Sequence, residues 1–152
     1  MATTSDEIND LFLSLIQDNR ITEIYQSSGS TALGIYLEPY LLYAIDDFSP
    51  ICTQALVYDT STQTFSLDLS QTHKNILAQI MVKYWFQREV QDLLQMRLKL
   101  QDRDFKHFSE AQNLREKKDL WNAKMEEVSA ILSKYGLRNN DWVGWADQNF
   151  GV

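Results

Sequence analysis

Apolar residues recur every three or four positions in several stretches of the chain, a spacing that predicts α-helices. The first stretch spans residues 3–19, and its apolar positions are Ile8, Leu11, Phe12, Leu15 and Ile16. Thr4 and Glu7 stand where a capping box requires them, so we expect a short amphipathic helix to begin there.

Residues 20–36 show no clear period, and the segment QSSGS at 26–30 has the composition of a loop. A second helix is predicted to begin near Glu38, because Pro39 is tolerated in a helix only in its first turn. The apolar positions that support this helix are Leu37, Tyr40, Leu41, Ala44 and Phe48.

Between residues 54 and 69 the pattern changes to an alternation of polar and apolar residues on each side of DTSTQ. Such alternation around a polar turn predicts a small β-hairpin. Because an isolated hairpin is only marginally stable, it is expected to pack on the helices or to pair with another segment.

The longest periodic segment, residues 71–100, carries apolar residues on more than one side. One stripe consists of Ile76, Leu77, Ile80, Met81 and Tyr84, whereas Val82, Phe86, Val90 and Leu93 point elsewhere. A helix of this kind lies in the middle of a bundle or contacts another subunit. Thirty residues would extend ~45 Å, so part of the helix is expected to protrude from the domain or to border a neighbour.

A last long helix is predicted from Ser109, as its N-cap, to a left-handed Gly136 just beyond its end. It should return antiparallel to the preceding helix. We therefore predict a mainly α fold: a helical bundle built on two long antiparallel helices, with a small β-hairpin and an extended C-terminal arm. Residues 1–136 would form the helical domain and residues 137–152 the arm.

Composition and charge narrow the class of protein. The 152 residues suit one domain, the single cysteine, Cys52, excludes an internal disulfide, and no signal peptide or membrane span is evident, so a soluble intracellular protein is expected. Residues 1–70 hold ten acidic side chains and one basic one, whereas residues 71–152 hold eleven and thirteen. This polarity disfavours duplex DNA binding and favours head-to-tail contact between copies, although a solvated acidic surface would look the same.

The sequence offers few groups for catalysis. Its two histidines, His73 and His107, are predicted at opposite ends of one long helix, and Cys52 lies in a third region. No HExxH, CxxC, GxSxG or phosphate-binding glycine motif occurs. We expect no enzymatic activity, no metal and no cofactor.

The candidate binding residues are aromatic. Trp142, Trp145 and Phe150 follow the last predicted helix, and together they could bury ~600 Å², worth ~15 kcal/mol at ~25 cal/mol per Å². Ordering the arm costs ~1 to 2 kcal/mol for each of its residues, a total at least as large. The arm is therefore predicted to dock on a neighbouring protein, the alternative being that it folds back over its own bundle.

A second candidate contact is the loop between the two long helices. Phe105 stands there between Asp104 and Lys106. These three residues are either a contact point for another chain or part of an ordinary interhelix loop whose phenylalanines cap the bundle.

The strings NILAQIMVKYWFQREV and DFKHFSEAQNLREKKDLW resemble the head-to-tail connector proteins of tailed bacteriophages, also called adaptor or head-completion proteins. The resemblance covers roughly residues 37–132. The positions that carry it are Ile76, Leu77, Ala78, Met81 and Trp85, followed by Asp104, Phe105, Lys106, Ser109 and Ala111.

The resemblance implies a virion protein that forms a ring of twelve copies between portal and tail, with DNA passing through its channel. It also implies that the C-terminal arm reaches the portal protein. Two other functions stay open: an interaction subunit of a cellular complex, and a helical nucleic-acid-binding protein. The latter would use Arg97, Lys99, Arg103 and Lys106, next to which Asp102 and Asp104 weaken a phosphate-binding strip.

Overall fold

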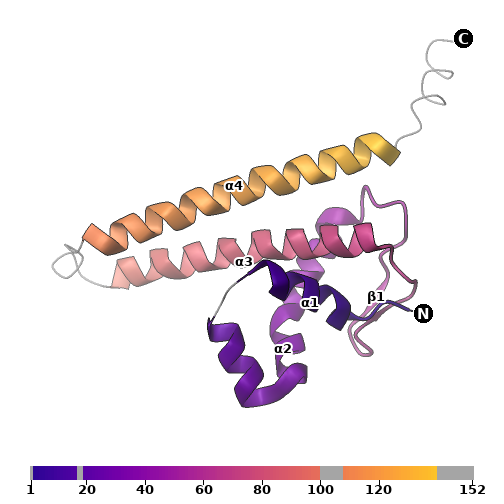
Figure 1. Cartoon of the computed structure of the whole chain (residues 1–152), viewed down its shortest axis with the longest axis horizontal. Helices are drawn as coiled ribbons and strands as arrows, with labels where there is room; N and C mark the ends of the chain where they lie inside the picture. Colours follow the sequence, from indigo (N-terminus) through magenta and orange to yellow (C-terminus); the bar gives the residue numbers. More distant parts are fainter. Residues whose placement is uncertain (1, 17–18, 100–107, 140–152) are drawn as a thin grey trace, which may run out of the picture.

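A computed structural model describes residues 2–16, 19–99 and 108–139, which form four helices and one two-stranded antiparallel sheet (Figure 1). The elements are α1 (Ser5–Leu15), α2 (Asn19–Phe48), β1 (Tyr58–Asp59), β2 (Thr64–Phe65), α3 (Gln71–Lys99) and α4 (Phe108–Asn139). The mainly α fold with a small hairpin is thereby confirmed.

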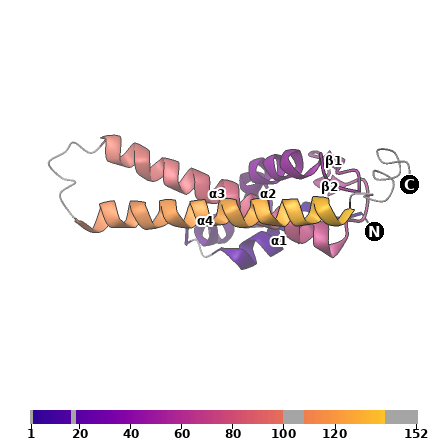
Figure 2. The ribbon, with the colours of Figure 1, turned by 90° about the horizontal axis from the view of Figure 1, so that it is seen from above.

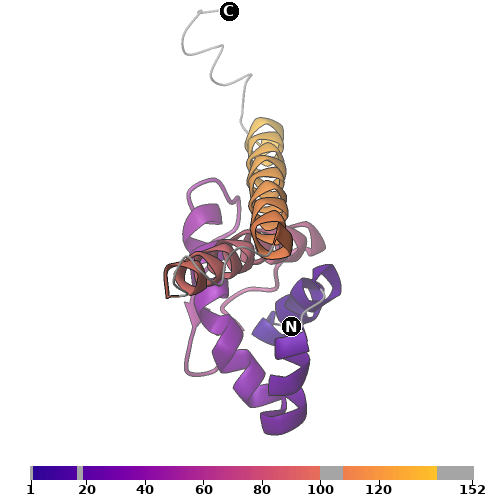
Figure 3. The ribbon, with the colours of Figure 1, turned by 90° about the vertical axis from the view of Figure 1, so that its left-hand side faces the viewer.

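Helix α3 is the centre of the fold, because it packs against α1, α2 and α4. In Figure 3 it lies between α2 on one side and α4 on the other. Leu77 and Met81 of one predicted stripe are fully buried, and Val82 and Val90 of the other set are buried as well. The apolar residues on several sides of α3 thus mark a helix in the middle of a bundle.

Helices α3 and α4 form the predicted antiparallel hairpin, and their outer halves extend beyond the other helices (Figures 1 and 2). Within the described residues, Val90 is the last buried hydrophobic residue of α3, and Val128 and Tyr135 are the buried ones of α4. The hairpin is therefore held to the rest of the fold at one end only.

The segment before α1 pairs with the β-hairpin. Phe65 donates its backbone N–H to the Thr3 carbonyl at 2.8 Å, and Ser5 donates to the Gln63 carbonyl at 2.9 Å. The Thr3 hydroxyl, which is fully buried, accepts the Leu69 amide at 2.8 Å. These bonds supply the pairing that a two-stranded hairpin needs. At the start of α1 the expected capping box is present.

Helix α2 differs from the prediction. It begins at Asn19 rather than near Glu38, and QSSGS is helical on both sides of one non-helical residue, Gly29. Pro39 lies inside the helix, not in its first turn. The helix continues across this proline because Leu33, Leu37 and Leu41, one turn apart, are buried in the core.

Both predicted ends of α4 were also wrong. The helix includes Ser109 instead of starting after it, and it runs through Gly136, which has no left-handed backbone, to Asn139. The Asn139 side-chain amide donates to the Tyr135 carbonyl at 2.9 Å and so satisfies one of the last exposed carbonyls. Residues 137–139 of the predicted arm are therefore helical.

Substitution of alanine at Gly29 and at Gly136 is expected to change the free energy of unfolding in opposite directions. Gly29 has φ 77° and ψ −177°, a conformation open almost only to glycine, so Gly29→Ala should lower the free energy of unfolding by about 1 to 3 kcal/mol. Helical Gly136 has open space around the position of a Cβ, and Gly136→Ala should raise it by about 0.5 to 1 kcal/mol. Urea unfolding measures both, and a stabilising Gly29→Ala would refute the assigned backbone.

Candidate functional site

The six residues predicted to contact a partner lie outside the described residues. They are Trp142, Trp145 and Phe150 of the arm and Asp104, Phe105 and Lys106 of the loop. Their role as binding residues stays a prediction. The described part of the chain contains two other arrangements of functional groups, a buried polar cluster and a hollow on the surface.

The His73 cluster consists of His73, Tyr135, Thr53 and Gln54. The His73 Nδ1 lies 2.5 Å from the Gln54 Oε1, and its Nε2 lies 2.8 Å from the Tyr135 hydroxyl. Because a carbonyl oxygen only accepts, Nδ1 carries the proton and Nε2 accepts the hydroxyl proton of Tyr135. The Tyr135 oxygen in turn accepts the Thr53 amide at 3.1 Å.

Aromatic rings enclose this cluster. The Phe48 ring meets His73 and Tyr135 edge-on, with centroids 5.6 and 5.0 Å apart. The cluster joins the end of α2, the start of α3 and the last turns of α4. Burial lowers the pKa of His73, because removal from water disfavours the charged imidazolium. Because its hydrogen bonds and ring contacts join three helices, we interpret the cluster as a structural connection. Within the described residues, no group of acids, histidines and cysteine could hold a metal ion.

The lowered pKa predicts acid sensitivity. Between the unfolded value of 6.5 and the lower folded pKa, unfolded chains bind the proton and folded chains do not, so stability falls as pH falls. The slope should approach at most about 1.4 kcal/mol per pH unit. Urea unfolding from pH 7 to 5 measures it, and His73→Gln should flatten it.

This window separates His73 from the carboxylates. The pKa of Glu7 is lowered from 4.5 by its hydrogen bonds with the Lys74 ammonium and the Thr4 amide, so its contribution is lost only as pH falls below that value. An equal slope in wild type and His73→Gln above pH 5 would contradict the assignment to His73.

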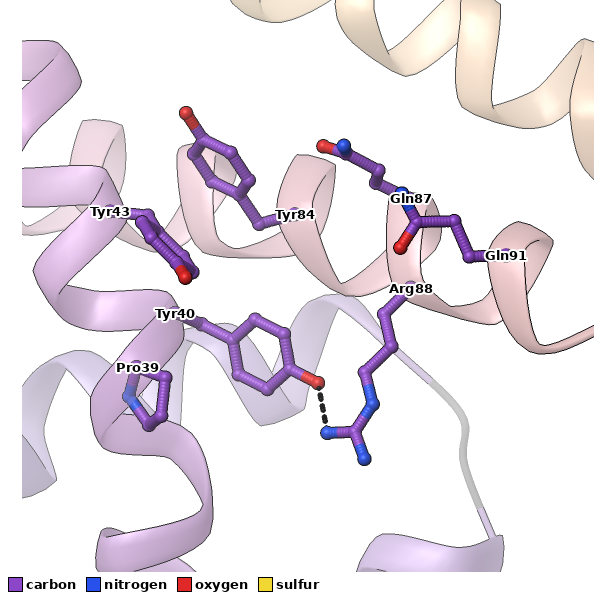
Figure 4. A pocket seen from close by; sticks show the side chains of 7 residues that line it. All are labelled: Pro39, Tyr40, Tyr43, Tyr84, Gln87, Arg88 and Gln91. Atoms are coloured by element: carbon purple, nitrogen blue, oxygen red, sulfur yellow. Dashed lines mark hydrogen bonds between the residues drawn. The ribbon is translucent and has the colours of Figure 1, made fainter.

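The tyrosine hollow lies between α2 and α3 and has a volume of about 430 Å³ (Figure 4). Its lining residues are Pro39, Tyr40, Tyr43, Tyr84, Gln87, Arg88 and Gln91. They offer aromatic faces, one guanidinium and two amides, without a carboxylate, thiol or imidazole among them. Aromatic faces with a few polar groups among them are typical of a binding site.

Three polar contacts hold the walls of the hollow in place. Arg88 Nη1 donates to the Tyr40 hydroxyl at 2.8 Å, and burial raises the pKa of Tyr40 to about 12. On the other side, Asp47 accepts hydrogen bonds from Lys83 and from the Tyr84 hydroxyl. The ring of Tyr43 lies 5.1 Å from that of Tyr84 and is about half exposed. The tyrosine hollow is therefore preformed, because contacts among its own lining residues hold its walls.

Beside the hollow, α2 exposes a row of apolar residues, the α2 outer row, made of Ile35, Pro39, Leu42 and Tyr43. Ile35 is 62% exposed and Tyr43 is 53% exposed. These residues recur at helical spacing on the side of α2 opposite its buried leucines. Neither the α2 outer row nor the tyrosine hollow was predicted from the sequence. The row could have been found, because Ile35, Pro39 and Leu42 recur at helical spacing on the side of α2 opposite the residues that pack in the core.

Comparison with protein-family models, with curated proteins and with solved structures found no match to this chain. Among the described helices, none has the length and apolar character to cross a membrane. The functional interpretation consequently rests on the geometry described above and on the sequence.

Proposed function

We propose that this protein is a virion structural protein, a head-to-tail connector that forms a ring below the portal of a tailed bacteriophage and joins it to the tail. The observation that carries this proposal is the pair of unlike exposed surfaces on the two sides of α3. One is the α2 outer row, and the other is α4, on which Leu120 and Met125 are 56% and 43% exposed.

A ring of identical copies requires two different contact surfaces on each copy. Copies that associate head to tail contact each other through two different surfaces, and the association closes into a ring when the rotation between copies permits it. The charge distribution supports the same arrangement, because the acidic side chains of residues 1–70 would meet the more basic second half of the next copy. The sequence resemblance to connector proteins supports the place of this ring in the virion.

The test is assembly with a portal. The proposal requires a portal protein in the genome that encodes this chain. The full chain is purified with that portal protein, and native mass spectrometry and electron microscopy are used to look for a ring of this chain on it. We expect a ring around a central channel. A chain that stays monomeric at all portal concentrations would contradict the proposal.

Removal of residues 140–152 is the matching variant. The truncated chain keeps α4 complete to Asn139, so its helical circular dichroism should be unchanged while its assembly with the portal is lost. If the truncated chain unfolds, the arm belongs to its own bundle and the arm's predicted docking role is wrong.

A further inference from the structure

We propose that the tyrosine hollow of one copy receives residues 140–152 of a second copy. A Trp142 or Trp145 indole would lie against Tyr43 and Tyr84, and a carboxylate beside it would pair with Arg88. The inference deepens the proposed function and rests on it, because both require that copies of the chain associate. It places the binding site of the arm on another copy of the same chain.

The shape of the surface fits an aromatic peptide. A hollow of about 430 Å³ lies within the size range of sites that enclose small ligands, and it can take one large side chain with its neighbours. Figure 4 shows Tyr43 and Tyr84 on one side of the hollow and Arg88 on the other. The α2 outer row continues the apolar surface away from Tyr43, so an extended segment could remain in apolar contact beyond the hollow.

The chemistry of the arm complements these groups. Residues 140–152 contain two tryptophans and two aspartates, without lysine or arginine. Asp141 precedes Trp142 directly, and Asp147 follows Trp145 by two places. An arginine can stack on an indole and bind a carboxylate with two parallel hydrogen bonds. The same short segment therefore offers an indole to the tyrosine rings and a carboxylate to the guanidinium beside them.

Arg88 already has partners, but its side chain is 47% exposed. It forms an ion pair with Asp92, whose carboxylate lies 3.9 Å from its Nε. The guanidinium carbon lies 5.3 Å from the centre of the Tyr36 ring, and the Tyr40 hydroxyl takes one of the five guanidinium N–H donors. The bond to Tyr40 fixes the guanidinium at the edge of the hollow, which favours recognition of an incoming carboxylate.

The arm of the same chain is poorly placed to fill the hollow. The Tyr135 hydroxyl touches His73, so α4 ends beside the start of α3, whereas Tyr84 lies eleven residues further, or ~16 Å along the helix. Because α4 runs antiparallel to α3, Asn139 lies one turn, or ~6 Å, beyond Tyr135 on the side away from Tyr84. From Asn139, Trp142 reaches ~10 Å, which is too short, and Trp145 reaches ~20 Å only with the backbone fully extended. A second copy meets no such limit.

Disulfide trapping between full-length chains tests this. In a Cys52→Ser background, one variant carries Gln91→Cys at the edge of the hollow, and the other carries Val143→Cys between the two tryptophans. The two are mixed at about 0.5 mM under mild oxidation, a concentration that populates even a complex of millimolar Kd. We expect a mixed dimer to form about tenfold faster than with Leu67→Cys, an exposed control position in the hairpin region.

Two further variants test the contacts. Tyr43→Ala and Arg88→Glu, each added to the Gln91→Cys chain, should lower the trapping rate about tenfold, to that of the control, while helical circular dichroism stays unchanged. Arg88→Glu combined with Asp141→Arg on the other chain should restore it. Equal rates for Gln91 and Leu67, or trapping that survives Tyr43→Ala, would overturn the proposal.

Three other results would separate this inference from the connector proposal. A disulfide within a single chain that carries both cysteines would show that the arm binds its own hollow. Trapping of Val143→Cys by the portal protein but not by Gln91→Cys would assign the arm to the portal; both results overturn this inference and leave the connector proposal standing. Efficient trapping without any ring on the portal would instead support the inference and contradict the connector proposal.

Discussion

Replacing Tyr135 with alanine is expected to lower the free energy of unfolding by about 3 to 5 kcal/mol. The side chain is 8% exposed, its ring packs edge-on against Phe48 and His73, and its hydroxyl bonds to His73 and Thr53. The loss combines a cavity with unpaired polar groups in a buried place. Urea unfolding measures it, and circular dichroism reports whether α4 stays helical.

Tyr135→Phe separates the two contributions. It keeps the ring and removes the hydroxyl, which leaves the His73 Nε2 and the Thr53 amide without this partner, and should cost about 1 to 3 kcal/mol. If Tyr135→Ala changed stability by less than about 0.5 kcal/mol, a value typical of surface positions, α4 would not be anchored where we place it.

Leu77→Ala is the second substitution with a large expected effect. Leu77 is fully buried in α3, the helix that contacts the other three, so its truncation leaves a cavity at the centre of the bundle. A loss of about 2 to 5 kcal/mol is expected. Leu120→Ala is the matched control: this leucine is 56% exposed on α4, and its truncation should change stability by less than about 0.5 kcal/mol.

Thermal and urea unfolding of the two leucine variants give the comparison. Comparable losses would mean that the outer surface of α4 is covered in solution, for instance by a second copy. In that case the loss in Leu120→Ala should depend on protein concentration, as the stability of an associating protein does.

The helices with a strong apolar period were predictable from sequence. Leu77 and Met81 recur with their neighbours at the helical period and so lie on one side of α3. These residues are buried because that side of the helix packs on the core. The capping box at Thr4 and the alternation around DTSTQ likewise depend on residues close in sequence. Local rules were sufficient there because all the interacting groups lie within a few positions.

The errors and omissions have a different cause. The start of α2 depends on burial of Leu33 and Leu37 against distant helices, which outweighs the effect of Pro39 and of the serines near Gly29. The His73 cluster joins residues more than sixty positions apart. The tyrosine hollow likewise forms only when α2 meets α3. No local pattern contains these pairings, although each residue is visible in the sequence.

The α3–α4 hairpin is attached to the rest of the fold at one end only, so its outer part can tilt about that end. Nine residues separate Val90, the last buried hydrophobic residue in the described part of α3, from Lys99, where the described helix ends, a length of ~14 Å. A tilt of about 10° at Val90 would displace that end by ~2 Å without stretching any helical hydrogen bond. In the ring proposed above, copies whose bundles are packed identically could then hold the outer parts of α3 and α4 at slightly different heights.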